Sequence, residues 1–209
     1  CSLLFGMFSA ASLFLGHFGF GAVFATISAF LDSLDGLVAR LTGCASDAGE
    51  VLDAAIDRYV EFFFLGALVL YYRDMVGLQL LAIAVLLGSF MVSYSTAKAE
   101  ALGIKIASGM MRRPERAFYL IVGAALSPIS IRFLEAFNPI PIGYPMVAAL
   151  LFVGLLSNIT AIERFWTIAK RVRTRNGVLD HSSSNEPAIE REAENNQWTI
   201  TNTDPIQIG

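Results

Sequence analysis

The stretch that decides the architecture is residues 31–61, LDSLDGLVARLTGCASDAGEVLDAAIDRYVE. It places Asp32, Asp35, Asp53 and Asp57 in or beside segments whose other residues are largely apolar. An ionised side chain at membrane depth costs about 2.5–3.5 kcal/mol even on lenient insertion scales, so such charges are kept mainly for function. Four carboxylates in this setting therefore predict that cations bind beside them.

Helical spacing divides this segment into two stripes, separated by a break at residues 42–46, TGCAS. Residues three, four, seven and eight apart share one face of a helix. The first stripe comprises Asp32, Asp35, Gly36, Ala39 and Arg40, and the second comprises Gly49, Asp53 and Asp57. Two antiparallel helices should then face each other with two carboxylates on each.

Carboxylate oxygens are the ligands that hard divalent cations prefer, and magnesium commonly shares them with substrate phosphates. Two such ions about 4 Å apart can hold a diphosphate and stabilise charge on a leaving phosphate. Gly36 leaves room for a ligand to approach the backbone. Arg40 offers a forked donor to a phosphate. The segment therefore predicts a site for two Mg²⁺ or Mn²⁺ ions and a diphosphate.

The rest of the chain is apolar. Hydrophobic residues make up 55% and charged residues only 16%, whereas soluble domains carry about 25% charged residues. A helix needs about 20 apolar residues to cross a bilayer. Six candidate spans fall at about 2–16, 18–39, 54–72, 78–102, 115–131 and 144–169. We expect an all-α, polytopic membrane protein with about six transmembrane helices.

Two expectations concern the ends of the chain. Residues 1–172 should form the transmembrane domain, and residues 173–209, rich in Ser, Asn, Glu and Thr, should form a disordered cytoplasmic tail. The chain opens at Cys1 inside an apolar run. We interpret it as having lost its start; a cleaved signal peptide is the alternative, but no basic region precedes the run.

Basic residues set the orientation. With six spans, one side of the membrane receives thirteen of the fifteen Lys and Arg residues, and the other side receives only Arg73 and Arg132. Loops rich in Lys and Arg stay in the cytoplasm. Both termini and the break at residues 42–46 should therefore face the cytoplasm.

The spaced residues of 32–57 resemble the signature of the CDP-alcohol phosphotransferases, D-x2-D-G-x2-A-R-x8-G-x3-D-x3-D, with every fixed position filled. The resemblance implies an integral membrane enzyme that moves a phosphatidyl group from CDP-diacylglycerol, or a similar CDP-lipid, to an alcohol and releases CMP. It also implies a bacterial inner-membrane location and a possible homodimer. The expected partners are the CDP-lipid, a small polar alcohol and the bilayer, without nucleic acid.

The resemblance also assigns roles within the signature. Asp32, Asp35 and Asp53 would bind metal. Asp57 would act as general base on the acceptor hydroxyl and share the second metal. The positions that would contact the cytidine diphosphate are Gly36, Ala39, Arg40 and Gly49.

A second cluster concerns the acceptor. The runs SYSTAKAE at 93–100 and RPER at 113–116 resemble bacterial phosphatidylinositol-phosphate synthases of this family, although those enzymes often have Lys or Arg where this chain has Thr96. An inositol phosphate is therefore the expected acceptor, and glycerol-3-phosphate, serine and free inositol remain open. The acceptor-binding residues would be Ser93, Lys98, Arg112, Arg113, Arg116 and Arg164. The alternative without a binding role is that these basic residues only set the membrane topology.

Two other enzyme or transport classes fit less well. A membrane prenyltransferase would need a second Asp-rich motif, and a cation transporter would spread its carboxylates across the membrane. We interpret Glu61 as a structural carboxylate with a basic partner. The aromatic residues Phe62, Phe63, Phe64, Tyr71 and Tyr72 are interpreted as lipid-facing bulk and interface anchors.

Overall fold

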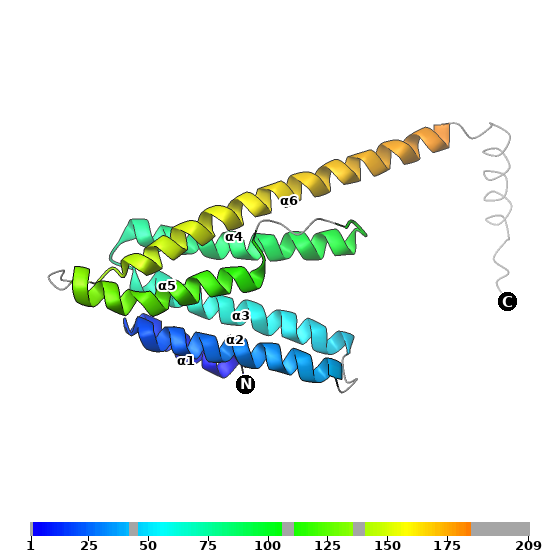
Figure 1. Ribbon diagram of the computed structural model, residues 1–209. Coiled ribbons are helices and arrows are strands. Elements are labelled where there is room, and N and C mark those ends of the chain that lie inside the picture. The colour runs from blue at the N-terminus through cyan, green and yellow to red at the C-terminus, as the bar shows by residue number, and fades with distance from the viewer. Residues whose placement is uncertain (1, 42–45, 106–110, 136–140, 185–209) are drawn as a thin grey trace, which may run out of the picture. The chain divides into compact units, whose positions relative to one another are not determined.

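The protein consists of helices throughout the part of the chain that the computed structural model describes, residues 2–41, 46–105, 111–135 and 141–184 (Figure 1). The six helices are α1 (Ser2–Phe14), α2 (Phe18–Leu41), α3 (Asp47–Tyr71), α4 (Val76–Ala101), α5 (Arg113–Leu134) and α6 (Tyr144–Ser184). The expected all-α class is therefore confirmed.

Four helical segments are long and apolar enough to cross a membrane: Phe18–Val38, Val76–Ala101, Arg113–Leu134 and Tyr144–Arg175. The helix α1 is apolar but has only 13 residues. The helix α3 has 25 residues, and its first half carries Asp53, Asp57 and Arg58. The polytopic membrane architecture holds, with four clear spans where the sequence predicted about six.

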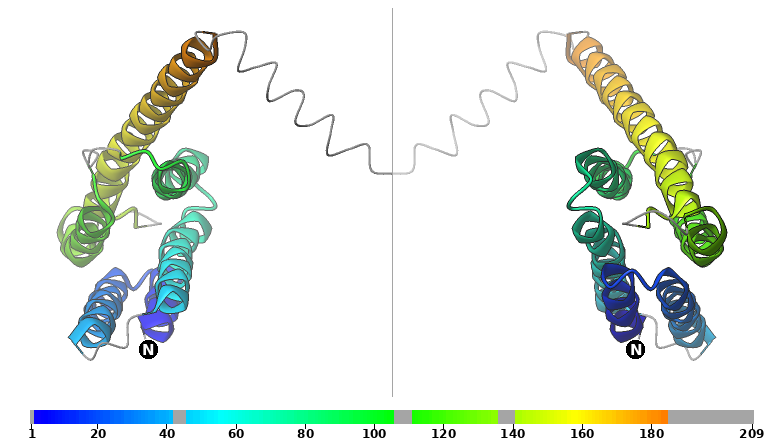
Figure 2. Two further views of the ribbon diagram at one scale, coloured as in Figure 1. Left: turned by 90° about the vertical axis from the view of Figure 1, so that its right-hand side faces the viewer. Right: turned by 90° about the vertical axis from the view of Figure 1, so that its left-hand side faces the viewer.

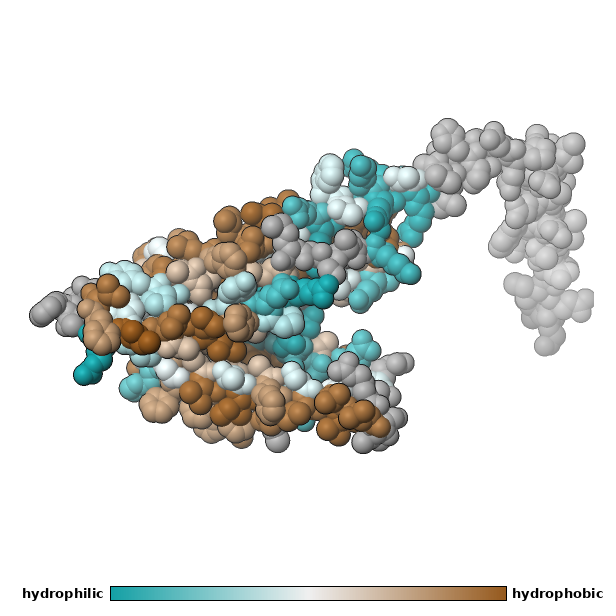
Figure 3. Space-filling view, in the orientation of Figure 1, coloured by the Kyte–Doolittle hydropathy of each residue, from teal (hydrophilic) through white to brown (hydrophobic). Residues whose placement is uncertain are grey.

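The chain divides into two compact units, Cys1–Phe165 and Trp166–Gly209. Within the first unit, α1 packs against both α2 and α3, α2 packs against α5, and α3 packs against α4 (Figure 2). Hydrophobic side chains cover much of the visible face of these helices. Hydrophilic side chains gather toward the end where α2 ends and α3 begins (Figure 3). The aspartates of α2 and α3 therefore lie at one end of an apolar bundle.

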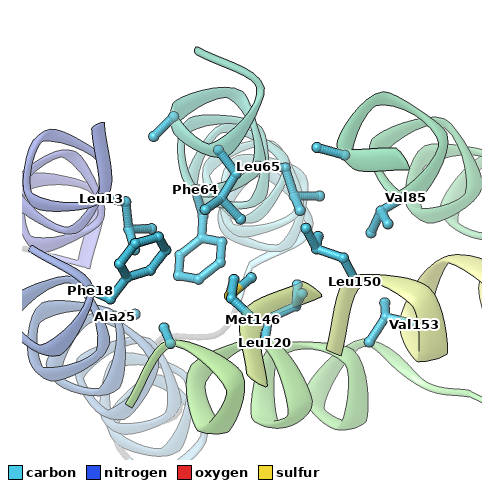
Figure 4. Packing of buried hydrophobic residues seen from close by; sticks show 14 of the residues in the cluster. Leu13, Phe18, Ala25, Phe64, Leu65, Val85, Leu120, Met146, Leu150 and Val153 are labelled. Atoms are coloured by element: carbon cyan, nitrogen blue, oxygen red, sulfur yellow. The ribbon is translucent and has the colours of Figure 1, made fainter. Parts of the chain in front are cut away.

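The core of the first unit lies between α3 and the helices around it. Leu65 of α3, Leu120 of α5 and Leu150 of α6 belong to one buried apolar cluster (Figure 4). Phe64 and Tyr72 are also buried, and Tyr72 is only 1% exposed. The interpretation of Phe64 as lipid-facing bulk was wrong, because it packs in the core, and Tyr72, the C-cap residue of α3, belongs to the same buried cluster.

Glycine residues allow two helices to approach α6 closely. A Cβ atom at Gly123 of α5 would lie 2.6 Å from the Cβ of Ala149 and 3.1 Å from the carbonyl oxygen of Pro145. A Cβ atom at Gly88 of α4 would lie 2.6 Å from Nδ2 of Asn158. Close backbone approach of this kind is how small residues support helix association in membranes.

The connection between α5 and α6 is organised by Glu135, which is 3% exposed. Its carboxylate accepts hydrogen bonds from Ser130 Oγ at 2.9 Å and from the backbone N–H groups of Ile142, Gly143 and Tyr144. Burial disfavours the charge, but these hydrogen bonds outweigh burial and hold the pKa of Glu135 below its ordinary range. A single carboxylate thus satisfies three successive backbone N–H groups where the chain enters α6, including that of Tyr144 in its first turn.

The helix α6 continues through residues 173–184, which the sequence assigned to the polar tail. The expected domain boundary at 172/173 therefore falls inside a helix. The remaining tail residues, 185–209, lie outside the described residues. A run of Lys and Arg residues, which are good helix formers, leads into this extension.

We predict that Gly123→Ala lowers the stability of the protein by about 1–3 kcal/mol, because the new methyl group meets the α6 backbone and has no flexible side chain to displace. The temperature midpoint of unfolding in detergent measures this loss. Gly66→Ala is the matched control: a Cβ there meets nothing within 4 Å, so α3 should be unchanged or stabilised by up to about 1 kcal/mol. Equal melting temperatures for Gly123→Ala and the unsubstituted protein would contradict the close approach.

We predict that Glu135→Gln destabilises the protein at neutral pH, because charge-assisted hydrogen bonds are replaced by weaker neutral ones. The sign of the pH effect follows from the lowered pKa. The contribution of Glu135 is present above its unfolded pKa of about 4.3 and is lost as the pH falls through the lower folded pKa. Melting temperatures measured from pH 7 to pH 3 should therefore converge for the two proteins in acid. A constant difference across that range would show that the charge of Glu135 is not what matters.

Candidate active site

Two helix segments deliver the carboxylates to one end of the bundle. Asp32 and Asp35 lie near the end of α2, and Asp53 and Asp57 lie near the beginning of α3. The start of α3 is fixed by Ser46, whose extended backbone (φ −135°, ψ 152°) and side chain form an N-cap. Its Oγ accepts a hydrogen bond from the backbone N–H of Gly49 at 3.1 Å.

Three of the four carboxylates come together. One oxygen from each of Asp32, Asp53 and Asp57 lies within 4.8 Å of the others. Asp57 is buried, Asp32 is half-buried and Asp53 is exposed. Asp35 lies outside this group and is exposed, although its charge still acts on Asp32. The facing stripes therefore meet, with Asp35 at the margin of the group.

The donor set fits a hard divalent cation. All three groups offer carboxylate oxygens, which Mg²⁺ and Mn²⁺ accept as ligands. Oδ1 of Asp57 is buried and has no hydrogen-bond partner among the described residues. A buried acceptor without a partner costs roughly 1–3 kcal/mol, so this oxygen is well suited to a cation or a proton from a bound ligand.

Arg113 lies against the same carboxylates. It is the first residue of α5, and Pro114 follows it in the first turn, where its fixed φ and missing N–H are tolerated. Nη1 of Arg113 donates a hydrogen bond to Oδ2 of Asp57 and lies 3.9 Å from Oδ2 of Asp32. The neighbouring Arg112 is exposed, and its backbone N–H donates to the carboxylate of Glu115 at 2.7 Å. The two adjacent arginines thus differ in exposure, and Arg113 is the one shown on the aspartates.

Arg116 lies one turn further along α5 and is 1% exposed. Its Nε donates to Oε1 of Glu61 at 3.3 Å. The prediction that Glu61 pairs with a basic neighbour is therefore confirmed. Nη2 of Arg116 is buried without a hydrogen-bond partner in the described part of the chain.

Arg164 reaches the same region from α6. Its Nη1 donates to Oγ1 of Thr96 at 2.6 Å, while its Nε is buried without a partner in residues that the structure describes. The positive charge of Arg116 acts on both Arg113 and Arg164. Arg113 therefore contacts the aspartates, Arg116 contacts Glu61, and Arg164 is near enough to Arg116 for the two charges to interact.

The remaining predicted residues lie on α2, α3 and α4. Ser93 is half-buried and Lys98 is exposed on α4. Gly36 lies on α2, and the N–H of Gly49 is used by the cap of α3. The side chains of Ala39 and Arg40 lie outside the described residues.

A cavity of about 210 Å³ opens beside the carboxylates. Its polar end is formed by Asp32, Asp57, Glu61 and Arg113, and its walls continue along small and apolar residues such as Gly6. The helices α1, α2, α3 and α5 all contribute to the lining. A molecule with a charged head and an apolar body matches this cavity.

Sequence reasoning missed two side chains that matter here. Ser46 caps the N-terminus of α3. A Ser that precedes an acidic first turn is typical of a helix N-cap, so the sequence contained a signal for it. Thr96 holds Arg164, and no spacing rule links residues on two helices that are distant in sequence.

Comparison with known proteins agrees with this geometry. Residues 1–169 match the family model described as CDP-alcohol phosphatidyltransferase. A phosphatidylinositol phosphate synthase of Mycobacteroides abscessus is 31% identical over 193 residues, covering 90% of this chain and 81% of that protein. An archaetidylinositol phosphate synthase of Pyrococcus horikoshii is 34% identical over 153 residues, covering 72% of this chain and 70% of that protein.

Solved structures show the same relationship. The crystal structure of Mycobacterium tuberculosis phosphatidylinositol phosphate synthase with CDP-DAG bound has a TM-score of 0.67 and 26% identity, and the match covers 80% of this chain and 83% of that one. The same enzyme in complex with manganese and citrate also has a TM-score of 0.67, with 80% and 79% covered. The family match spans most of the helical bundle and includes the whole aspartate signature, so the chain belongs to the CDP-alcohol phosphatidyltransferase family of membrane enzymes.

Proposed function

We propose that this enzyme transfers the phosphatidyl group of CDP-diacylglycerol to an inositol phosphate and releases CMP. The observation that carries the choice of acceptor is the pair of buried guanidinium donors, Nη2 of Arg116 and Nε of Arg164, that lack partners among the described residues. Buried charged donors are costly unless a ligand pairs with them. An acceptor that carries a phosphate supplies the missing oxygens, whereas serine and free inositol have no phosphate to offer.

The relatives favour the inositol phosphate over glycerol-3-phosphate. The matched proteins of M. abscessus and M. tuberculosis are both named phosphatidylinositol phosphate synthases. The P. horikoshii relative is named for archaetidylinositol phosphate, so the head group is shared while the lipid differs. The inositol phosphate head group is therefore the feature that these three named enzymes share.

The proposed reaction uses Asp57 and Arg113 at the polar end of the cavity, together with the buried guanidinium groups of Arg116 and Arg164. The acceptor hydroxyl attacks the β-phosphorus of the CDP-lipid, the bond from that phosphorus to the bridging oxygen breaks, and CMP leaves. Asp57 takes the hydroxyl proton on Oδ1, while Arg113 holds Oδ2 of the same carboxylate. Arg116 and Arg164 hold the phosphate of the acceptor in place.

Asp32, Asp35, Asp53 and Asp57 would hold the divalent ions. Such ions, when bound, neutralise the negative charge that develops on the leaving phosphate. Gly36, Ala39, Arg40 and Gly49 would contact the nucleotide, as the signature implies. The apolar walls of the cavity would accommodate the lipid, which enters from the bilayer, while the acceptor enters from the aqueous side. We place that side in the cytoplasm of a bacterial cell, at the inner membrane, and expect a homodimer.

We predict that excess chelator abolishes CMP release and that Mg²⁺ or Mn²⁺ restores it.

We predict that Asp57→Asn retains binding of the CDP-lipid, measured by calorimetry, yet loses turnover by about 10²–10⁴-fold, because the proton acceptor is gone. The control is Asp74→Asn, an exposed carboxylate 3.6 Å from Arg73 in the α3–α4 connection, which should leave the rate unchanged. Full activity in chelator would defeat the metal assignment, and normal turnover in Asp57→Asn would defeat the base.

We predict that Arg164→Ala raises the KM for inositol phosphate about tenfold to a hundredfold, since a charge-assisted contact to phosphate contributes roughly 1.5–3 kcal/mol. The KM for CDP-diacylglycerol should stay nearly constant. Arg132→Ala, at the last turn of α5, is the control for loss of a cation. A panel of inositol phosphate, glycerol-3-phosphate, serine and free inositol completes the assay. Better use of an uncharged acceptor would refute the proposed function.

A further inference from the structure

Arg164 is anchored on α4 by one edge of its guanidinium group. Its Nη1 donates to Oγ1 of Thr96 at 2.6 Å and lies 3.5 Å from the carbonyl oxygen of Val92. Both partners belong to a helix 68 or more residues away in sequence. A long side chain that is otherwise free to rotate loses its alternative rotamers when it is held in this way.

The hydroxyl of Thr96 can act only as an acceptor toward Arg164. A threonine hydroxyl has one proton and two lone pairs. Oγ1 of Thr96 donates its proton to the carbonyl oxygen of Val92 at 3.1 Å, so its lone pairs remain for the guanidinium group. The β-branched side chain is also stiff about χ1. The acceptor position is therefore fixed by the helix itself.

The anchor of Arg164 differs in charge from the anchor of Arg116. Glu61 holds Arg116 by an ion pair at 3.3 Å, which offsets much of that positive charge. Thr96 is neutral and leaves the charge of Arg164 in place. The positive charge of Arg116 acts unfavourably on Arg164. The hydrogen bond to Thr96 holds Arg164 in place while its Nε, like Nη2 of Arg116, has no partner among the residues that the structure describes.

We propose that Thr96 is a positioning residue for the acceptor: its hydroxyl holds Arg164 in the orientation that binds the acceptor phosphate without neutralising the guanidinium charge. This inference rests on the proposed function, because it assumes that Arg164 binds the phosphate. It assigns to Thr96 a role in substrate affinity and none in proton transfer or donor binding.

Thr96→Val tests the proposal, because valine has nearly the same shape and lacks the hydroxyl. We expect the KM for inositol phosphate to rise about fivefold to thirtyfold, with the KM for CDP-diacylglycerol unchanged. Thr96→Ser keeps the hydroxyl and should stay within about twofold of the unsubstituted enzyme. Ser95→Ala is the matched control, because it removes a neighbouring hydroxyl that donates to the same carbonyl of Val92, at 2.7 Å, and leaves the hydrogen bond between Arg164 and Thr96 in place.

The coupling between the two residues separates this proposal from the proposed function. In the Arg164→Ala background, Thr96→Val should add no further rise in KM, because its effect acts through Arg164. A raised KM in Arg164→Ala with a normal KM in Thr96→Val would overturn the role of Thr96 and leave the proposed function standing. A normal KM for the phosphorylated acceptor in Arg164→Ala would overturn both. Melting temperatures in detergent identify any variant that fails to fold, and Thr96→Ala then replaces Thr96→Val.

Discussion

Negative charge held against an apolar helical bundle is the constraint on which this structure depends. Asp32, Asp53 and Asp57 bring their oxygens within 4.8 Å of one another, and like charges at that distance repel strongly where little water is present. Cations beside such a group relieve the repulsion. The approach of Arg113 to Asp57 and Asp32 supplies part of the required charge. The three carboxylates are suitable ligands for divalent ions, which would supply the rest of the positive charge.

The opposite end of the bundle provides the rigidity that this charged end requires. Glu135 secures the start of α6 through hydrogen bonds to successive backbone N–H groups. The hydroxyls of Tyr71 and Tyr72 donate to the carbonyl oxygens of Pro141 and Ile142 at 2.5 and 2.7 Å. The end of α3 and the beginning of α6 are thereby joined, so the site is built on helices that are fixed far from it. Positioning of this precision is what a transfer between two substrates needs.

The guanidinium groups illustrate how one fold can give similar side chains different properties. Arg113 lies on carboxylates that also suit metal, Arg116 is paired with Glu61, and Arg164 is held by a neutral hydroxyl. The positive charges of these three guanidinium groups are therefore offset to different degrees by their partners. In our proposal, this difference in how far each guanidinium charge is offset distinguishes the reacting end of the site from the end that binds the acceptor phosphate.

The sequence by itself determined the helical class, the membrane setting and the two aspartate stripes, because hydrophobic periodicity and residue spacing are local properties of the chain. It also predicted that Glu61 has a basic partner, although not that the partner is Arg116. Only the tertiary structure decided that Asp35 lies outside the carboxylate group, that Tyr72 is buried and that Thr96 holds Arg164. Each of these depends on how one helix is rotated and placed against another. Thr96 and Arg164 lie 68 residues apart, and local patterns do not encode a contact across that distance, which is set by the packing of whole helices.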